Sequence, residues 1–164
     1  MVPEIKLPRY EWPCGPYGVK KELPEEVRLE KNPTWIVVVA AALQAKDGRW
    51  LMQQRPRAKQ HGGLWEFPGG KVECGENPRE ALVRELHEEL AVSLRIDDLK
   101  PVGFAEDVGS EGNPEIVILL YSATRWRGEA IAQEESEVGW FEVAEMAKLP
   151  KPPLDVALLH FLTG

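Results

Sequence analysis

The chain has 164 residues, of which 43% are hydrophobic and 29% charged, which suits one domain with a real core. Its net charge of −7 opposes a broad basic surface, so we expect no binding to long nucleic acid. No apolar run approaches the ~20 residues of a membrane span, and no signal peptide is recognisable at the N-terminus. We therefore expect no membrane partner and a cytoplasmic location.

Cysteine usage is sparse. Cys14 and Cys74 form neither a Cys-x-x-Cys pair nor a cluster with histidine. This pattern favours free thiols over a zinc site or a disulfide framework.

The first 33 residues differ in composition from the rest. They are rich in proline and show little periodicity, which predicts an N-terminal extension over residues 1–33 and a single domain over residues 34–164. Residues 10–17 are too aromatic for a plain linker. We expect them to pack on the domain or on a second subunit, the latter giving a homodimer.

The domain opens with a predicted strand. Residues 35–43 form a β-branched and apolar run, Asp47 and Gly48 signal a hairpin turn, and residues 50–54 form the return strand. Later strands are predicted near residues 100–107, 115–124 and 139–142, and a last helix near residues 155–162. Periodicity alone predicts one domain of mixed α and β structure, with a sheet packed between helices.

A helix is predicted to begin after residue 77. Asn77 is a favourable N-cap, Pro78 suits the first helical position, and Glu80 stands where a capping box requires an acid. An apolar stripe follows on one face: Leu82, Leu86 and Leu90. The helix is expected to end near Ala91.

The last two turns of this helix carry an unfavourable charge pattern. Glu85, Glu88 and Glu89 are spaced i, i+3, i+4 and project from one face near the negative end of the helix dipole. Each repulsion costs only about 0.2–1 kcal/mol on an exposed helix, so a solvated acidic face is one interpretation. The other is a divalent cation, because clustered hard oxygen ligands suit Mg²⁺ or Mn²⁺.

The residues before and within the helix decide between these interpretations. The segment reads Gly70-x5-Glu76-x7-Arg84-Glu85-Leu86-x-Glu88-Glu89-x-Ala91-Val92 and resembles the Nudix box. Residues 65–71, Trp-Glu-Phe-Pro-Gly-Gly-Lys, extend the likeness to the MutT-type nucleoside triphosphate pyrophosphohydrolases. Ala91 stands where the box has glycine, which predicts that the helix C-cap does not adopt the left-handed conformation.

The resemblance implies an α/β fold, a Nudix-type α/β/α sandwich with a mixed β-sheet, and a Mg²⁺ site in which Mn²⁺ can substitute. It assigns the metal ligands as follows: Glu85, Glu88, Glu89, the backbone carbonyl of Gly69 and a further acid, Glu134, with Glu135 and Glu137 as rivals. The general base is either Glu85 or Glu88.

Arg84 completes the predicted catalytic set with these two glutamates. Because i+1 neighbours diverge on a helix, Arg84 is expected to orient the loop carboxylate Glu76 rather than to pair with Glu85. Gly70 and Glu76 are interpreted as structural supports of the box.

Four residues are predicted to bind the substrate. Arg55 matches the position of a phosphate-contacting arginine in MutT-type enzymes, unless it is an exposed charge at a strand end. Phe67 and Leu120 line a base pocket or belong to the core. Asp155 follows Pro-Pro-Leu, similar to the Pro-Pro-Ala-Asn stretch that binds a purine; an ionised Asp only accepts hydrogen bonds, so the base must offer N–H groups. Asp155 is equally suited to cap the last helix.

The resemblance implies a Mg²⁺-dependent enzyme that cleaves a nucleoside triphosphate to a monophosphate and pyrophosphate. Such an enzyme can clear non-standard nucleotides, with 8-oxo-dGTP and CTP as candidate substrates. Other Nudix substrates stay open: dinucleoside polyphosphates, nucleotide sugars and the 5′ end of RNA. A non-catalytic nucleotide-binding module is disfavoured, because every acid of the box is present.

Overall fold

The computed structural model describes residues 35–107, 109, 114–133 and 136–163. The predicted extension over residues 1–33, and with it the predicted homodimer contact, therefore lies outside the described residues. Cys74 is exposed in the loop before the acidic helix and is disulfide-bonded, which corrects the prediction of a free thiol. An exposed loop cysteine is accessible to a second thiol, a possibility that residue spacing does not reveal.

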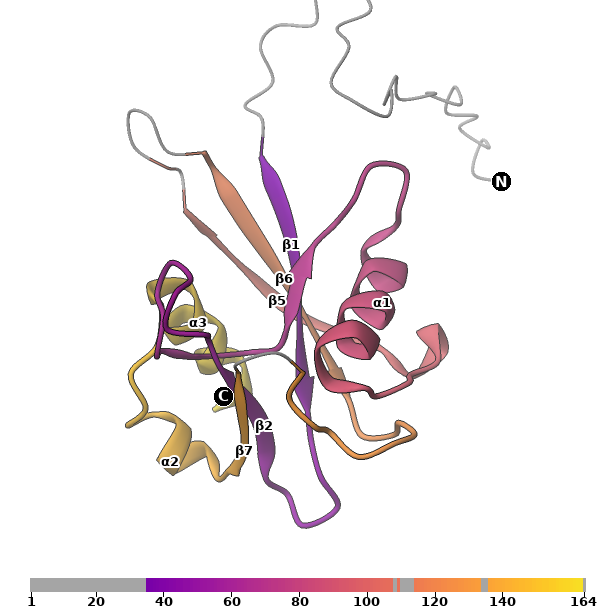
Figure 1. The fold of residues 1–164 in the computed structure, drawn as a ribbon, viewed down its shortest axis with the longest axis vertical. Helices are drawn as coiled ribbons and strands as arrows, with labels where there is room; N and C mark the ends of the chain where they lie inside the picture. Colours follow the sequence, from indigo (N-terminus) through magenta and orange to yellow (C-terminus); the bar gives the residue numbers. More distant parts are fainter. Residues whose placement is uncertain (1–34, 108, 110–113, 134–135, 164) are drawn as a thin grey trace, which may run out of the picture. The chain divides into compact units, whose positions relative to one another are not determined.

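A mixed four-stranded sheet forms the centre of the domain (Figure 1). Strand β1 (Ile36–Leu43) runs parallel to β6 (Ile116–Ala123), with Val39 opposite Leu119. Strand β5 (Lys100–Asp107) pairs antiparallel with β6, and the short β4 (Gly69–Lys71) pairs antiparallel with β1. The order β4-β1-β6-β5 places the start of the Nudix box on the strand beside β1.

A second, antiparallel sheet has β2 (Trp50–Gln54) between β3 (Trp65–Glu66) and β7 (Glu137–Phe141). The predicted turn at Asp47 and Gly48 forms, and Gly48 adopts φ of +90°. The two strands that it joins nevertheless belong to different sheets, linked only by a bridge between Gln44 and Trp50 among the described residues. The return strand thus has the predicted bounds but a different partner, and the divergence of the two sheets makes room for a cleft.

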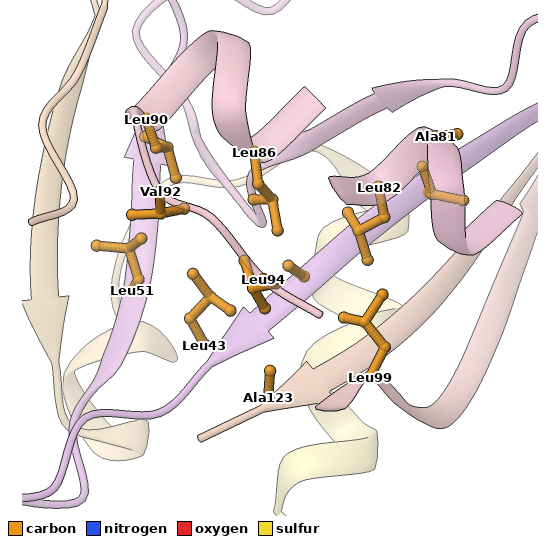
Figure 2. Close-up of a cluster of buried hydrophobic side chains, with 12 residues drawn as sticks. Leu43, Leu51, Ala81, Leu82, Leu86, Leu90, Val92, Leu94, Leu99 and Ala123 are labelled. Atoms are coloured by element: carbon orange, nitrogen blue, oxygen red, sulfur yellow. The ribbon is translucent and has the colours of Figure 1, made fainter. Parts of the chain in front are cut away.

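Helices α1 (Pro78–Leu90) and α3 (Pro153–Leu159) lie on opposite sides of the strands (Figure 1). A short helix, α2 (Val143–Met146), and 3-10 turns at Ile96–Asp98 and His160–Leu162 complete the described elements. Two clusters of buried side chains hold these layers together. Figure 2 shows the first, in which Leu82, Leu86 and Leu90 of α1 pack against Leu43 and Leu51. The second lies on the α3 side and includes Met52, Phe67, Leu120 and Leu158.

Two expectations about helix ends are wrong. Ala91 adopts φ +57° and ψ +21°, so the C-cap of α1 is left-handed even without glycine, and its N–H donates to the carbonyls of His87 and Leu86. The bonds that end the helix outweigh the steric cost of the conformation, about 1–2 kcal/mol. Asp155 does not cap α3, because Pro152 holds the N-cap position and Asp155 lies within the first turn.

Within the described ranges, no helix is long and apolar enough to cross a membrane.

Candidate active site

The N-terminus of α1 is tied to the loop before it. The Asn77 side chain accepts hydrogen bonds from the backbone N–H groups of Arg79 and Glu80, and the Glu80 carboxylate accepts one from the Asn77 N–H. This capping box fixes where the helix begins. Because Leu82, Leu86 and Leu90 are fully buried, the rotation of the helix is fixed as well, and its acidic face turns toward the loop around Gly69 and Gly70.

Arg84 connects the acids of the box. Its Nε and one terminal nitrogen donate to the two oxygens of Glu76, each at 3.0 Å, as predicted. Its other terminal nitrogen donates to Glu85 at 2.9 Å and to Glu88 at 3.2 Å, which the prediction had excluded for Glu85. The long guanidinium reaches around the helix, so divergence of i+1 side chains at Cβ does not prevent the contact. Bonds to Arg84 lower the pKa of Glu76, and bonds to Glu76 and Glu85 raise that of Arg84.

Gly70 and Gly69 allow the loop to lie against its neighbours. A Cβ at Gly70 would lie 2.3 Å from the carboxyl carbon of Glu85, so only glycine leaves space for this acid. Gly69 has φ of +152°, and a Cβ there would lie 2.0 Å from the Val39 carbonyl oxygen. Gly69 and Glu85 thereby line a common cleft.

Glu89 is a partly buried acid beside that loop. Burial raises its pKa to about 7, and the nearby charges of Glu85 and Glu66 add to the shift, whereas a hydrogen bond with the Gly69 backbone opposes it. A partly buried carboxylate next to like charges is an unfavourable arrangement in a protein that has no use for it. Perturbed acids of this kind are typical of functional sites.

A cleft of about 960 Å³ contains most of the predicted site residues. Its lining includes the following predicted residues: Arg55, Phe67, Gly69, Gly70, Glu85, Glu88, Glu89 and Asp155. Leu120 does not line it; its side chain is 1% exposed and belongs to the buried cluster beside α3. Of the two predictions for Leu120, a base-pocket residue or a core residue, the structure agrees with the second. The predicted ligand Glu134 and its rival Glu135 lie outside the described residues, and Glu137 is exposed on β7.

The described residues contain no group of three or more His, Cys, Asp or Glu side chains positioned to hold a metal ion. Glu88 is turned toward Arg84, and its side chain is 58% exposed. Glu85 and Glu89 both face the cleft together with Gly69. The three-glutamate ligand set thus stays a prediction, and two of its members, Glu85 and Glu88, are bonded to Arg84 in this structure.

Arg55 lies in the cleft and is engaged with Glu66. Its NH1 nitrogen donates to both oxygens of Glu66, at 2.8 and 2.7 Å, and its Nε donates to the Gln60 carbonyl. Burial nevertheless raises the pKa of Glu66 to about 7, because desolvation outweighs the bonds to Arg55. The alternative of an exposed strand-end charge is wrong for Arg55, which is only partly exposed and oriented by this acid.

Asp155 joins the last helix to the Nudix loop. Its Oδ1 accepts a hydrogen bond of 2.9 Å from the backbone N–H of Phe67, 88 residues earlier in the chain. The carboxylate is buried, which raises its pKa to about 6 in spite of that bond. Phe67 is itself buried, with 3% exposure, and forms the floor of the cleft at this end.

Two further residues, Glu66 and Gln53, line the cleft and were not predicted to be site residues. Glu66 immediately precedes Phe67 in the MutT-like segment, so its position in the motif was an available signal. Gln53 lies on β2, two residues before Arg55, which follows the last residue of the strand.

Comparison with known proteins agrees with this geometry. A family model described as the NUDIX domain matches residues 33–161, so the chain belongs to the Nudix hydrolase family. The predicted resemblance and the predicted α/β Nudix fold are confirmed. Divalent metal ions are generally used by this family.

Several relatives are similar over most of their length. The CTP pyrophosphohydrolase of Escherichia coli K12 is 34% identical over 126 residues, which cover 76% of this chain and 90% of that protein. The 8-oxo-dGTP diphosphatase of Haemophilus influenzae is 31% identical over 128 residues, covering 77% and 90%. The crystal structure of a MutT NUDIX hydrolase from Burkholderia pseudomallei superposes with a TM-score of 0.69 at 27% identity, covering 78% of this chain and 98% of that one.

Proposed function

We propose that this Nudix hydrolase is a Mg²⁺-dependent pyrophosphohydrolase that cleaves a nucleoside triphosphate to a nucleoside monophosphate and pyrophosphate. The observation that carries the proposal is the shared cleft, in which the acids of the box lie at one end and Asp155 and Phe67 at the other. Relatives named for CTP and 8-oxo-dGTP support the choice of a nucleoside triphosphate.

The residues at the acidic end fit a divalent cation in donor chemistry. Glu89 is partly buried with a raised pKa, and Glu85 and Gly69 line the same cleft, so the group offers hard oxygen ligands. Glu85, Glu89 and the Gly69 carbonyl would hold the ion, joined by Glu88 and by Glu134. When bound, a divalent cation neutralises phosphate charge and lowers the pKa of water.

The protein's own groups then divide the remaining tasks. Glu85 or Glu88 accepts the proton of the attacking water, and Arg84 holds the first of these acids in place. Arg55 is oriented by Glu66 toward the cleft, where its charge favours binding of the phosphate chain. Water adds to one of the two phosphorus atoms of the α–β anhydride, and the bond from that phosphorus to the bridging oxygen breaks. The water oxygen stays on the attacked phosphorus and the bridging oxygen leaves with the other group, so the products are a monophosphate and pyrophosphate.

The opposite end of the cleft supports recognition of the base. Asp155 has a pKa of about 6, so it is ionised at pH 7.5 or so and only accepts hydrogen bonds. One of its oxygens is used by the Phe67 N–H, which leaves the other for an N–H donor on the base. An exocyclic amino group, such as that of cytosine or adenine, or the N1–H and N2–H of guanine, meets this requirement.

The test is release of pyrophosphate with Mg²⁺ from all standard NTPs and dNTPs and from 8-oxo-dGTP, with ADP-ribose and a diadenosine polyphosphate as the alternatives. The matched variants are Glu89→Gln in the cleft and Glu129→Gln in an exposed loop, which make the same chemical change. We expect one or a few triphosphates to react, a loss of about 10²-fold or more in Glu89→Gln, and no change in Glu129→Gln. Turnover that survives Glu89→Gln, or turnover confined to the alternative substrates, would reject the proposal.

A further inference from the structure

Gln53 is a buried polar residue whose side-chain oxygen lacks a hydrogen-bond partner among the described residues. It is 5% exposed, and its Oε1 has no hydrogen-bond partner among the described residues. Its neighbour on β2 behaves differently, because the Gln54 Nε2 donates to the Gly63 carbonyl at 2.9 Å. A buried amide oxygen without a hydrogen bond reduces the stability of the fold, so its presence at this position suggests a functional reason.

The direction of the Gln53 side chain follows from strand alternation. Leu51 belongs to the cluster packed on α1 and Met52 to the cluster packed beside α3, so Gln53 faces the α1 side, as Leu51 does. In the register of the sheet, Gln53 lies opposite Glu66 on β3 and opposite Val138 on β7. The residue therefore stands at the border between the apolar cluster and the acidic end of the cleft.

The cleft residues nearest to Gln53 belong to the acidic end of the cleft and not to the end that holds Phe67 and Asp155. Arg55 follows the last residue of β2, and Glu66 lies opposite Gln53 on β3. The charge of Glu66 also contributes to the raised pKa of Glu89 on α1. Phe67 packs in the cluster on the α3 side, where it is bonded to Asp155. Gln53 thus lies on the side of the groups expected to handle phosphate.

An amide is suited to this position because it is uncharged and offers both a donor and an acceptor. Rotation by 180° about the bond to the amide carbon exchanges the two with no change in shape, so the buried end can present N–H as well as oxygen. Phosphate oxygens accept hydrogen bonds, and the charges of Glu66 and Glu89 oppose an anion bound nearby. A neutral amide donates a hydrogen bond to phosphate without adding a further negative charge beside these two acids. Leu51 and Val138 flank this position, so an apolar side chain could pack there and would leave no polar atom without a hydrogen bond.

We propose that Gln53 is a substrate-binding residue that donates its amide N–H to a phosphate oxygen of the bound triphosphate. This proposal rests on the proposed function, and it deepens it by naming a residue that contacts the phosphate chain. It also predicts opposite signs for stability and affinity, because replacing Gln53 by an apolar residue removes a buried oxygen without a partner and, together with it, the N–H that binds phosphate.

The test compares Gln53→Met with Gln54→Met, two adjacent substitutions that make the same change in the full chain. Inorganic triphosphate with Mg²⁺ is the probe, because it carries the phosphate chain without a base, and its affinity is measured by calorimetry together with the thermal unfolding midpoint. For Gln53→Met we expect affinity to fall about tenfold to a hundredfold and the midpoint to rise by about 2 °C or more. For Gln54→Met we expect a lower midpoint and unchanged affinity, because Gln54 is bonded to Gly63 and does not line the cleft.

Three outcomes would overturn the assignment of Gln53: unchanged affinity in Gln53→Met, a fall in its unfolding midpoint that accompanies the loss of affinity, or no binding of triphosphate by the wild type. The proposed function fails separately. If the wild type binds triphosphate and Gln53→Met weakens it, yet no nucleotide yields pyrophosphate, the phosphate contact stands and the reaction is wrong. If nucleotides are cleaved but Gln53→Met binds as the wild type does, the reaction stands and the contact is wrong.

Discussion

The two ends of the cleft hold their carboxylates in different ways. At the α1 end, Arg84 bonds to Glu76, Glu85 and Glu88, so acids from a loop and a helix share one cation. At the α3 end, Asp155 accepts a hydrogen bond from a backbone N–H, and its burial raises its pKa to about 6 in spite of that bond. The arrangement at the α1 end depends on one side chain, Arg84, which a substitution can remove. The arrangement at the α3 end depends on burial and on a backbone N–H, both of which the fold provides. Substitutions at the first end should therefore affect activity most, and those at the second should affect stability and its pH dependence.

The largest expected effect comes from Arg84→Lys. Lysine keeps the charge but cannot bond to Glu76 through two nitrogens while also reaching Glu85 and Glu88. We expect kcat/KM for the triphosphate to fall by about 10²-fold and the free energy of unfolding to fall by about 2 kcal/mol. Steady-state kinetics and urea unfolding measure the two effects. Retention of full activity would show that the orientation of Glu85 does not depend on this network.

Gly70→Ala should separate activity from stability at the same end. The new Cβ would meet the Glu85 carboxylate, which is the end of a flexible side chain and can move, so the fold is retained while the acid is displaced. We expect a loss of activity of about tenfold to a hundredfold with an almost unchanged unfolding midpoint. Gly69→Ala is the contrast, because its Cβ would meet the Val39 backbone, and it should lower the midpoint strongly. A Gly70→Ala variant that unfolds as readily as Gly69→Ala would contradict this distinction.

Asp155→Asn tests the other end of the cleft through pH. The folded-state pKa of about 6 exceeds the ordinary 3.8, so the folded protein binds the proton more tightly. The contribution of Asp155 is thus fully favourable below about pH 4 and is lost as pH rises through 6. Asparagine stays neutral and can still accept from the Phe67 N–H, so we expect the variant to exceed the wild type by about 2 kcal/mol at pH 8 and by little at pH 4. Urea unfolding at the two pH values checks this, and an equal difference at both would refute it.

The smallest effect is expected for Ala91→Gly, at the end of α1 but away from the cleft lining. Ala91 is left-handed with φ +57°, a conformation that glycine adopts at lower cost. We predict a gain of about 1 kcal/mol in the free energy of unfolding and unchanged kcat/KM. A destabilised variant would mean that the alanine methyl group makes a contact that matters more than the backbone.

Much of the fold and part of the site were predictable from local patterns. The capping residues and leucine stripe of α1, and the bounds of β2 and β5, agree with the structure because they depend on neighbours in the chain. The separation of β1 and β2 into two sheets was not predictable, since the turn between them is the same in either case. The reach of Arg84 to Glu85 and the burial of Leu120 likewise depend on side-chain length and packing that periodicity does not encode.

The hydrogen bond between Asp155 and the Phe67 N–H has a consequence for how the protein is made. Phe67 directly precedes the loop that carries Gly69 and Gly70, and its partner lies on the last α-helix, 88 residues later. During synthesis the anchor of that loop therefore leaves the ribosome 88 residues after Phe67. A shortened chain that retains every acid of the Nudix box but lacks α3 would have the ligands without the support that places them, so the cleft is completed only when the final helix has packed.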